Sequence, residues 1–202
     1  GGAKVFLVGH SYGCSIAHMF LQFAPQAWKD QYIAGYVSFS GPYLGSPLAP
    51  FVALTGISSG GAHSSGIQMN QTLVSNWALN TGVISALFPF PQWVNSGEPI
   101  IGFGGKNYTS LELPDAFATV GGAASGRAAT AMSPNYDIVP PNVTTHCVNG
   151  YGSQTIFQTF FPDNVTNPLG ISPSSATMLD GDTVVPRSSL NECQSWKGHQ
   201  AY

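Results

Sequence analysis

The chain has 202 residues, of which 43% are hydrophobic and 12% aromatic, enough to bury a sizeable core and to exclude long disorder or a collagen-like repeat. Only 7% of the residues are charged and the net charge is −3, so no basic face is available for nucleic-acid phosphates, and we expect no nucleic acid among the partners. The 24 glycines and 15 prolines indicate a globular protein with many loops.

No stretch is long enough for a membrane-spanning helix. The longest apolar runs, such as Val5–Val8 and Val83–Phe90, fall well short of the roughly 18 residues that a bilayer requires. The first residue is Gly1 rather than Met, and no basic leader precedes the strand-like run. We therefore expect the chain to be a fragment of a longer protein.

The first forty residues predict a strand, a helix and a second strand. Residues 4–8 are typical of a buried strand. Apolar residues recur at helical spacing and predict a helix over about 11–23 that Pro25 ends: Ile16, Met19, Phe20 and Phe23. Residues 32–40 predict a second buried strand. Because a strand–helix–strand unit favours parallel strands, we expect the α/β class with a parallel sheet flanked by helices.

The turn between the first strand and the helix carries a nucleophile motif. Residues 9–13 read Gly-His-Ser-Tyr-Gly, the G-x-S-x-G pattern of a nucleophile elbow. Such a turn strains the serine backbone, and we expect Gly9 and Gly13 to let strand and helix pass closely. Ser11 is therefore the predicted nucleophile, with a coincidental turn as the alternative. The Tyr12 backbone N–H would donate to the oxyanion, unless its side chain instead lines the acyl channel.

After residue 40 the sequence signals for helices and strands are weaker. Residues 56–66 are rich in Gly and Ser and predict a flexible loop, either an active-site lid or an ordinary surface loop. Residues 116–131 are almost all Ala, Gly, Ser and Thr, so a helix there would be short and weakly anchored. Short strands are predicted at 145–148 and 175–179, and no domain boundary is apparent.

The acid of a serine triad follows the nucleophile in chain order in this type of site. Asp182 follows Gly181 at the end of a predicted buried strand, where its carboxylate can turn toward the base. Asp180 is the rival, whereas Asp137 and Asp163 lie in loops with no preceding strand. Asp182 is the predicted acid, and a plain Asp–Gly turn is the alternative.

None of the five histidines is well placed as the general base. Four precede the acid in the chain: His10, His18, His63 and His146. His199 lies only 17 residues after Asp182, which leaves little room for the helix and strand that normally separate acid from base. We interpret His199 as a surface residue and expect the catalytic histidine beyond residue 202.

The glycosylation sequons and the cysteines indicate in which cellular compartment the protein is expected. Four N-x-[ST] sequons begin at Asn70, Asn107, Asn142 and Asn164; chance alone produces some of them, but together they favour glycosylation and the secretory pathway. The three cysteines, Cys14, Cys147 and Cys193, allow at most one disulfide and one unpaired thiol, and their order along the chain does not choose the pair.

These residues resemble the lecithin:cholesterol acyltransferase family, which includes the group XV (lysosomal) phospholipase A2 and the phospholipid:diacylglycerol acyltransferases. Similar motifs occur in the family's order at 5–14, 25–30, 38–46, 107–109, 140–143, 146–147, 150–152 and 181–189, and at Cys193 and Trp196. The resemblance implies a partial α/β-hydrolase fold. Residues 1–202 would be part of one domain, with a cap or lid insertion at roughly 50–135 that includes the 56–66 loop.

Residue by residue, the resemblance supports Ser11 as nucleophile and Asp182 as triad acid. It also implies a Cys147–Cys193 disulfide and makes Cys14 a free thiol near the site. The sequence departs from the family in the Ala/Gly-rich stretch 67–135 and in Thr183–Val185, just after the acid. Substrate preference is therefore left open.

The expected activity is that of a lipid O-acyltransferase or phospholipase. Ser11 would take an acyl chain from a phospholipid, and an alcohol or water would accept it at a lipid or lipoprotein surface. No metal or cofactor is expected, and the compartment would be extracellular or lysosomal. One alternative is a non-catalytic lipid-binding pseudo-hydrolase, which the presence of both Ser11 and Asp182 disfavours. The other is a small secreted esterase, which would not begin on the nucleophile's own strand.

Overall fold

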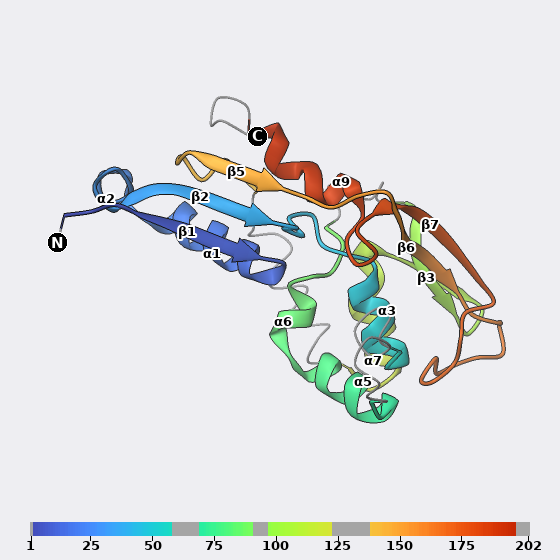
Figure 1. Ribbon diagram of the computed structural model, residues 1–202. Coiled ribbons are helices and arrows are strands. Elements are labelled where there is room, and N and C mark those ends of the chain that lie inside the picture. The colour runs from blue at the N-terminus through green and yellow to red at the C-terminus, as the bar shows by residue number, and fades with distance from the viewer. Residues whose placement is uncertain (1, 58–68, 91–96, 123–137, 197–202) are drawn as a thin grey trace.

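The computed structural model describes residues 2–57, 69–90, 97–122 and 138–196. They form two sheets flanked by helices (Figure 1). Sheet A has the order β1-β2-β5 and all its pairs are parallel; its strands are β1 (Val5–His10), β2 (Ile33–Phe39) and β5 (Thr145–Val148). Sheet B has the order β4-β3-β6-β7; its strands are β3 (Pro99–Phe103), β4 (Lys106–Thr109), β6 (Ser153–Phe160) and β7 (Ser175–Gly181).

These sheets and helices are compatible with the α/β class. The expected parallel sheet is sheet A, whereas sheet B is mixed, which was not expected. In sheet B only the β3–β6 pair is parallel, and β4 and β7 pair antiparallel at its two edges. The strands β3, β4 and β6 were not predicted, because β3 and β4 are only five and four residues long and β6 mixes polar and apolar residues without regular alternation. The predictions at 145–148 and 175–179 are confirmed as β5 and as most of β7.

The opening strand–helix–strand unit is confirmed. Helix α1 (Tyr12–Phe23) turns Cys14, His18 and Leu21 inward, a spacing of four and three residues that defines one helical face. The chain leaves α1 at Ala24 in an extended conformation, and Pro25 precedes the short helix α2 (Gln26–Tyr32). In Figure 1, α1 runs along one face of sheet A.

Two predicted buried strands are largely exposed. On β1 the side chains of Val5, Phe6 and Val8 are 55%, 58% and 64% exposed. Strand β1 lies at the edge of sheet A among the described residues, and β7 lies at the edge of sheet B, where only Gly181 is buried. An apolar run predicts that a strand forms, whereas its burial depends on how many neighbours the tertiary fold places beside it.

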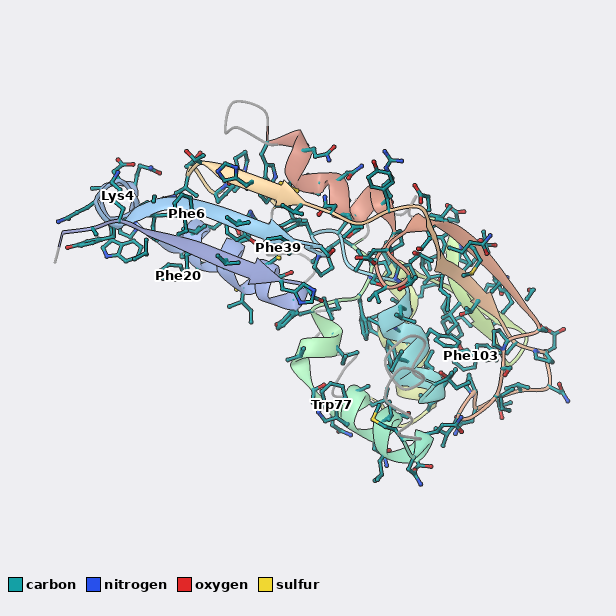
Figure 2. All side chains as sticks on the ribbon, viewed as in Figure 1. Lys4, Phe6, Phe20, Phe39, Trp77 and Phe103 are labelled. Carbon is teal, nitrogen blue, oxygen red and sulfur yellow. A yellow bond between two sulfur atoms is a disulfide. The ribbon has the colours of Figure 1, made fainter. Side chains whose placement is uncertain are left out.

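The core of the described residues consists of two hydrophobic clusters. The first joins α1, sheet A and the C-terminal segment through Cys14, Leu21, Ile33, Tyr36, Tyr43, Cys147, Cys193 and Trp196. The second lies between sheet B and four helices: α3 (Leu48–Thr55), α5 (Gln71–Asn80), α6 (Gly82–Ser85) and α7 (Leu113–Thr119). Figure 2 labels Phe6 and Phe20 on the side of sheet A and Phe103, a member of the second cluster, on the side of sheet B.

The predicted insertion at roughly 50–135 stays a prediction. Strands β3 and β4 come from this range but share a sheet with β6 and β7, which lie outside it. Of the stretch 116–131 the structure describes 116–122, and there the expectation of weak anchoring is wrong, because Ala116 and Phe117 on α7 are fully buried and the Phe117 ring stacks on Phe88 at 4.7 Å. Within the described chain, no helix combines the length and apolarity needed to cross a bilayer.

Candidate active site

Ser11 lies in the turn between β1 and α1 and has a strained backbone. Its φ of 52° and ψ of −128° are uncommon for a residue with a side chain. The Ser11 N–H donates to the Phe39 carbonyl at the end of β2 (2.9 Å), and its own carbonyl accepts from the Cys14 N–H (2.9 Å). The serine is therefore held both by the neighbouring strand and by the first turn of the helix.

The two motif glycines differ in what they contribute. A Cβ on Gly9 would lie 2.9 Å from both Cα and N of Cys14, so only glycine lets β1 pass this close to α1. A Cβ on Gly13 would meet no atom within 4 Å, so the expectation that both glycines are needed for close passage is wrong for Gly13. The Tyr12 N–H is the first of α1 and has no intrahelical acceptor by position, as the predicted oxyanion donor requires.

Asp182 begins a tight turn directly after β7. Its Oδ1 accepts hydrogen bonds from the backbone N–H groups of Val184 (3.0 Å) and Val185 (2.8 Å), and its own N–H donates to the Val185 carbonyl (3.2 Å). Because β7 is an exposed antiparallel strand, the expectation that a buried strand presents the acid is wrong. The turn itself orients the carboxylate, with Oδ1 occupied by the backbone.

We call residues 182–185 the acid turn. Two buried hydroxyl groups from other parts of the chain form hydrogen bonds with its backbone. The Thr183 N–H donates to Oγ1 of Thr155 on β6 (3.0 Å), and the Ser46 hydroxyl donates to the Val184 carbonyl (2.5 Å). Both hydroxyl-bearing residues are buried, and Thr183 itself has a φ of 81°. The position of Asp182 therefore depends on residues far from it in sequence.

Ser11 and Asp182 lie at the same edge of sheet A. Ser11 follows β1, and Asp182 lies beside Gly150, two residues after the end of β5, since a Cβ on Gly150 would be 3.5 Å from the Asp182 Cβ. The register pairs His10 with Phe39 and Phe39 with Val148, so the carboxyl ends of all three strands are level. Two strand spacings of about 4.8 Å separate β1 from β5. Ser11 and Asp182 therefore lie beyond the carboxyl ends of the two strands that flank β2.

Among the histidines, His18 is a core residue. It is fully buried on α1, its Nε2 lies 2.7 Å from the Val139 carbonyl oxygen, and its ring stacks on Trp196 at 4.8 Å. Burial lowers the pKa of His18, with the Val139 hydrogen bond opposing the shift. His10 is exposed at the end of β1 and His146 lies on β5. His63 and His199 lie outside the described residues, and a base beyond residue 202 stays a prediction.

The rival acid Asp180 is engaged in structural contacts. Its Oδ1 accepts from the Gly152 N–H (2.7 Å) and its Oδ2 pairs with Arg187 (3.2 Å), whose guanidinium lies over the Tyr151 ring. The Gly152 hydrogen bond, with a smaller contribution from Arg187, holds the pKa of Asp180 below its ordinary value. Of the other acids, Asp163 does follow a strand, β6, contrary to expectation, and Asp137 lies outside the described residues.

The structure joins Cys147 and Cys193 in a disulfide with a Cα–Cα distance of 6.3 Å, the pairing that the resemblance implies. It connects β5 to the 3₁₀ helix η2 (Asn191–Ser195), which follows α9 (Arg187–Leu190) and the acid turn. Cys14 is unpaired and buried, and its Sγ donates to the Phe39 carbonyl (3.3 Å). Burial raises the pKa of the Cys14 thiol.

The structure describes all four sequon asparagines but only the first two residues of the predicted lid. The asparagines of the four sequons, Asn70, Asn107, Asn142 and Asn164, are all exposed, although their glycosylation stays a prediction. Of the predicted lid, the structure describes only residues 56–57; 58–66 lie outside it. Gly56 ends α3 with a φ of 67°, and a Cβ there would collide with the Gln71 carbonyl.

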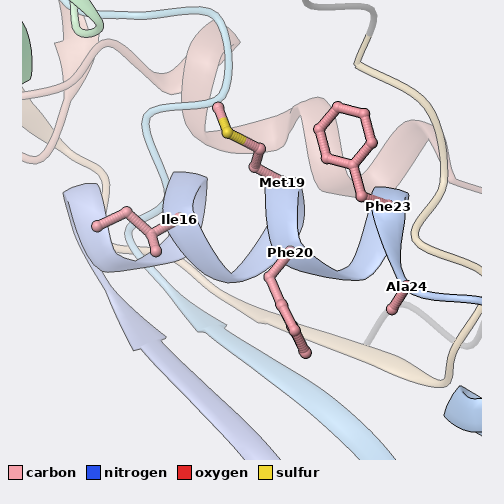
Figure 3. Close-up of a pocket in the computed structure, with 5 residues that line it drawn as sticks. All are labelled: Ile16, Met19, Phe20, Phe23 and Ala24. Atoms are coloured by element: carbon pink, nitrogen blue, oxygen red, sulfur yellow. The ribbon is translucent and has the colours of Figure 1, made fainter.

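An apolar cavity of about 450 Å³ lies on the outer flank of α1 (Figure 3). It is lined by Ile16, Met19, Phe20, Phe23 and Ala24. On a helix these positions lie opposite the inward-facing residues Cys14, His18 and Leu21. The cavity is therefore separate from the sheet edge that carries Ser11 and Asp182.

Comparison with known proteins identifies the family. The family model for lecithin:cholesterol acyltransferase matches residues 1–102. The human phosphatidylcholine-sterol acyltransferase is 30% identical over 209 residues, an alignment covering 98% of this chain and 44% of the human protein. The mouse protein of that name is 28% identical, and the alignment covers 99% of this chain and 44% of the mouse protein. A dog lysosomal phospholipase A and acyltransferase is 27% identical, and the alignment covers 100% of this chain and 47% of the dog protein.

The chain thus spans less than half the length of these curated relatives. The family match includes the whole of the elbow, from β1 through α1 and β2, together with α3, α5 and α6. The chain belongs to the lecithin:cholesterol acyltransferase family.

Proposed function

We propose that the protein to which this chain belongs transfers acyl groups from phospholipids through a covalent acyl-enzyme on Ser11. The observation that best supports this proposal is the strained backbone of Ser11. Its φ is 52° between a strand and a helix, and its N–H is held by the Phe39 carbonyl. Such strain in a residue with a side chain is concentrated at functional sites. The names of the relatives, a sterol acyltransferase and a phospholipase A with acyltransferase activity, support the same chemistry.

The first half-reaction forms the acyl-enzyme. The Ser11 Oγ attacks the carbonyl carbon of a phospholipid acyl ester, and its proton passes to the histidine that we expect beyond residue 202. The Tyr12 N–H donates to the oxyanion of the tetrahedral intermediate. When the intermediate collapses, the histidine returns the proton to the departing oxygen and the lysophospholipid leaves. Asp182 orients the histidine and stabilises its positive charge.

The second half-reaction releases the acyl chain. The hydroxyl of an alcohol, or water, attacks the acyl-Ser11 carbonyl while the same histidine takes its proton and then returns it to Ser11. The product is a new ester in the first case and a fatty acid in the second. All protons in this cycle move among Ser11, the histidine and the substrates, so the proposal includes no metal or cofactor.

Several features support the setting of this reaction. The parallel order β1-β2-β5 with the elbow after β1 supports a partial α/β-hydrolase fold. The exposed sequon asparagines support glycosylation in the secretory pathway, with an extracellular or lysosomal destination. The partners would be a phospholipid donor and an alcohol or water acceptor at a lipid or lipoprotein surface.

A serine-directed fluorophosphonate probe tests the proposal in the full-length protein. The wild type should be labelled and the Ser11→Ala variant should not, whereas Ser15→Ala, which removes a serine on the next turn of α1, should label like the wild type. Labelling of Ser11→Ala, or a burst of lysophospholipid from it, contradicts the proposal. An unlabelled wild type indicates instead a lipid-binding protein without catalysis.

A further inference from the structure

Three hydroxyl groups are buried together beneath the elbow. The residues are Tyr36, Ser38 and Tyr43, each at most 1% exposed, and we call them the hydroxyl cluster. The Tyr36 hydroxyl donates to the Cys14 carbonyl (2.9 Å) and lies 2.7 Å from the Tyr43 hydroxyl, which is hydrogen-bonded in turn to the Ser38 Oγ (2.7 Å). A continuous chain of hydrogen bonds thus runs from β2 to the first turn of α1.

The local sequence explains how these side chains meet. Tyr36 and Ser38 are two residues apart on β2, so both point to the face of sheet A that α1 covers. Tyr43 returns to this face after the turn at Gly41. A Cβ on Gly41 would lie 2.5 Å from the Tyr43 ring and 2.8 Å from the Ser38 Oγ, so the absence of a side chain there makes room for the ring.

The cluster contacts the same helical turn that holds Ser11. Cys14, whose carbonyl accepts from Tyr36, also donates its backbone N–H to the Ser11 carbonyl (2.9 Å). On the other side, the Phe39 carbonyl accepts from the Ser11 N–H (2.9 Å) and from the Cys14 thiol (3.3 Å). Strand β2 therefore holds the elbow twice, through its main chain at Phe39 and through the hydroxyl cluster.

Hydrogen bonds are directional, whereas apolar packing tolerates small displacements. A core of the same size built from Phe and Ala would fill this space without burying three polar groups. Connected buried hydrogen bonds favour one arrangement of the elements they join. Their presence directly beneath a strained residue suggests that they select the geometry of the turn.

We propose that Tyr36 and Tyr43 are positioning residues that hold the first turn of α1, and with it the strained Ser11 backbone and the Tyr12 N–H, in the reactive arrangement. This inference rests on the proposed function of Ser11. The hydroxyls themselves would not contact the substrate, because they are buried on the far side of the elbow. They act through Cys14 and the backbone of the turn.

Tyr43 also joins this support to the segment that follows the acid turn. Its ring lies edge-on to Trp196 at 5.0 Å and to His18 at 5.6 Å. Trp196 comes three residues after Cys193, which the disulfide ties to β5. The same side chain thus contacts the support of the nucleophile and the segment downstream of Asp182.

The cluster should act in the same way at every working pH. Burial, with the neighbouring Tyr43 and Cys14 adding to it, raises the pKa of Tyr36 far above its ordinary value, so the hydroxyl keeps its proton. Removing it should therefore lower the acylation rate without displacing the pH profile, because the titrating base is unchanged. A lost general base would displace that profile.

The test uses Tyr36→Phe and Tyr43→Phe in the full-length protein. Each keeps the ring and removes one hydroxyl. Active sites are titrated with the fluorophosphonate, and the single-turnover acylation rate is measured per titrated site over a range of pH. We expect a rate about 5- to 30-fold lower, within the loss that a displacement of under 1 Å produces, with KM changed less than about twofold and an unmoved pH profile.

Ser75→Ala is the matched control. Ser75 is also buried, and its hydroxyl donates to the Ala53 carbonyl (2.7 Å) in the second hydrophobic cluster, away from the elbow. It should lower Tm to a similar extent without changing the acylation rate per site. If a tyrosine variant does not fold, Ser38→Ala, which removes the end of the chain, should still lower the rate about two- to fivefold.

Acylation at the wild-type rate per site in the folded variants would overturn the inference, as would an equal loss in Ser75→Ala. Failure of the proposed function gives a different result. In that case the fluorophosphonate does not label Ser11 in the wild type, and no acylation rate exists to compare.

Discussion

The two halves of the candidate site are held in opposite ways. The nucleophile follows a parallel strand, and a motif of five residues sets its strained turn. The acid follows an exposed antiparallel strand, and its turn is closed by its own carboxylate and by hydroxyls from β6 and from the loop after β2. A short motif therefore marks the nucleophile in the sequence, although β2 also holds its turn, whereas no such motif marks the acid, which long-range contacts hold in place.

The disulfide should be the largest single contribution on the acid side. Replacing both Cys147 and Cys193 with Ala should lower the free energy of unfolding by about 3–4 kcal/mol, because the cross-link closes a loop between residues 46 apart in sequence. Denaturant unfolding of the full-length protein measures this. Reducing agent should destabilise the wild type and leave the double variant unchanged. Peptide mapping that finds Cys14 in the bridge would contradict the prediction.

Two glycine substitutions test the packing around the nucleophile without changing the acid turn. Gly9→Ala should lower the fluorophosphonate labelling rate about 100-fold, because its Cβ would collide with the Cys14 backbone and displace the elbow. Gly13→Ala should leave that rate within about twofold and raise stability by about 0.5–1 kcal/mol, since alanine favours a helix. Equal losses in the two variants would show that the close approach at Gly9 has no special role.

A buried threonine supports the turn that carries Asp182. Thr155→Val should remove the acceptor of the Thr183 N–H, lower stability by about 1–2 kcal/mol and slow acylation about tenfold. Thr159→Val is the control, since Thr159 is equally buried on β6 and lies away from the acid turn. It should keep the acylation rate within about twofold. A wild-type rate in Thr155→Val would mean that Thr155 is not needed to place Asp182.

The smallest effect concerns Asp180. Because its folded-state pKa is lowered, its stabilising contribution is present above the ordinary pKa of Asp, about 3.9, and is lost as the pH falls through the lowered value. The Tm difference between wild type and Asp180→Asn should therefore shrink as the pH falls below about 4. Arg187→Gln should remove less of it, since the Gly152 hydrogen bond is the larger cause. A Tm difference that does not vary with pH would refute this assignment.

The elements near the elbow could be predicted because their signals are local. The apolar run of β1, the helical spacing on α1 and the stop before Pro25 each depend on residues within one or two turns of each other. The apolar residues that predicted α1, however, lie on its outer flank, and the buried face of Cys14, His18 and Leu21 was not predicted. The Cys147–Cys193 pair came only from the family resemblance, since three cysteines alone do not choose a partner. The strand β6 was missed, and with it the strand that precedes Asp163.

The sequence alone determined that Ser11 is on a strand-to-helix turn, because φ and ψ preferences and apolar spacing act over a few residues. Only the tertiary structure decided that β1 lies at the edge of sheet A among the described residues, that Gly9 but not Gly13 is needed for close packing, and that Tyr36, Ser38 and Tyr43 share hydrogen bonds. It also decided the acid turn, whose contacts join residues 28 and 138 positions apart. Such contacts leave no periodic signal in the chain, because they depend on which strands become neighbours.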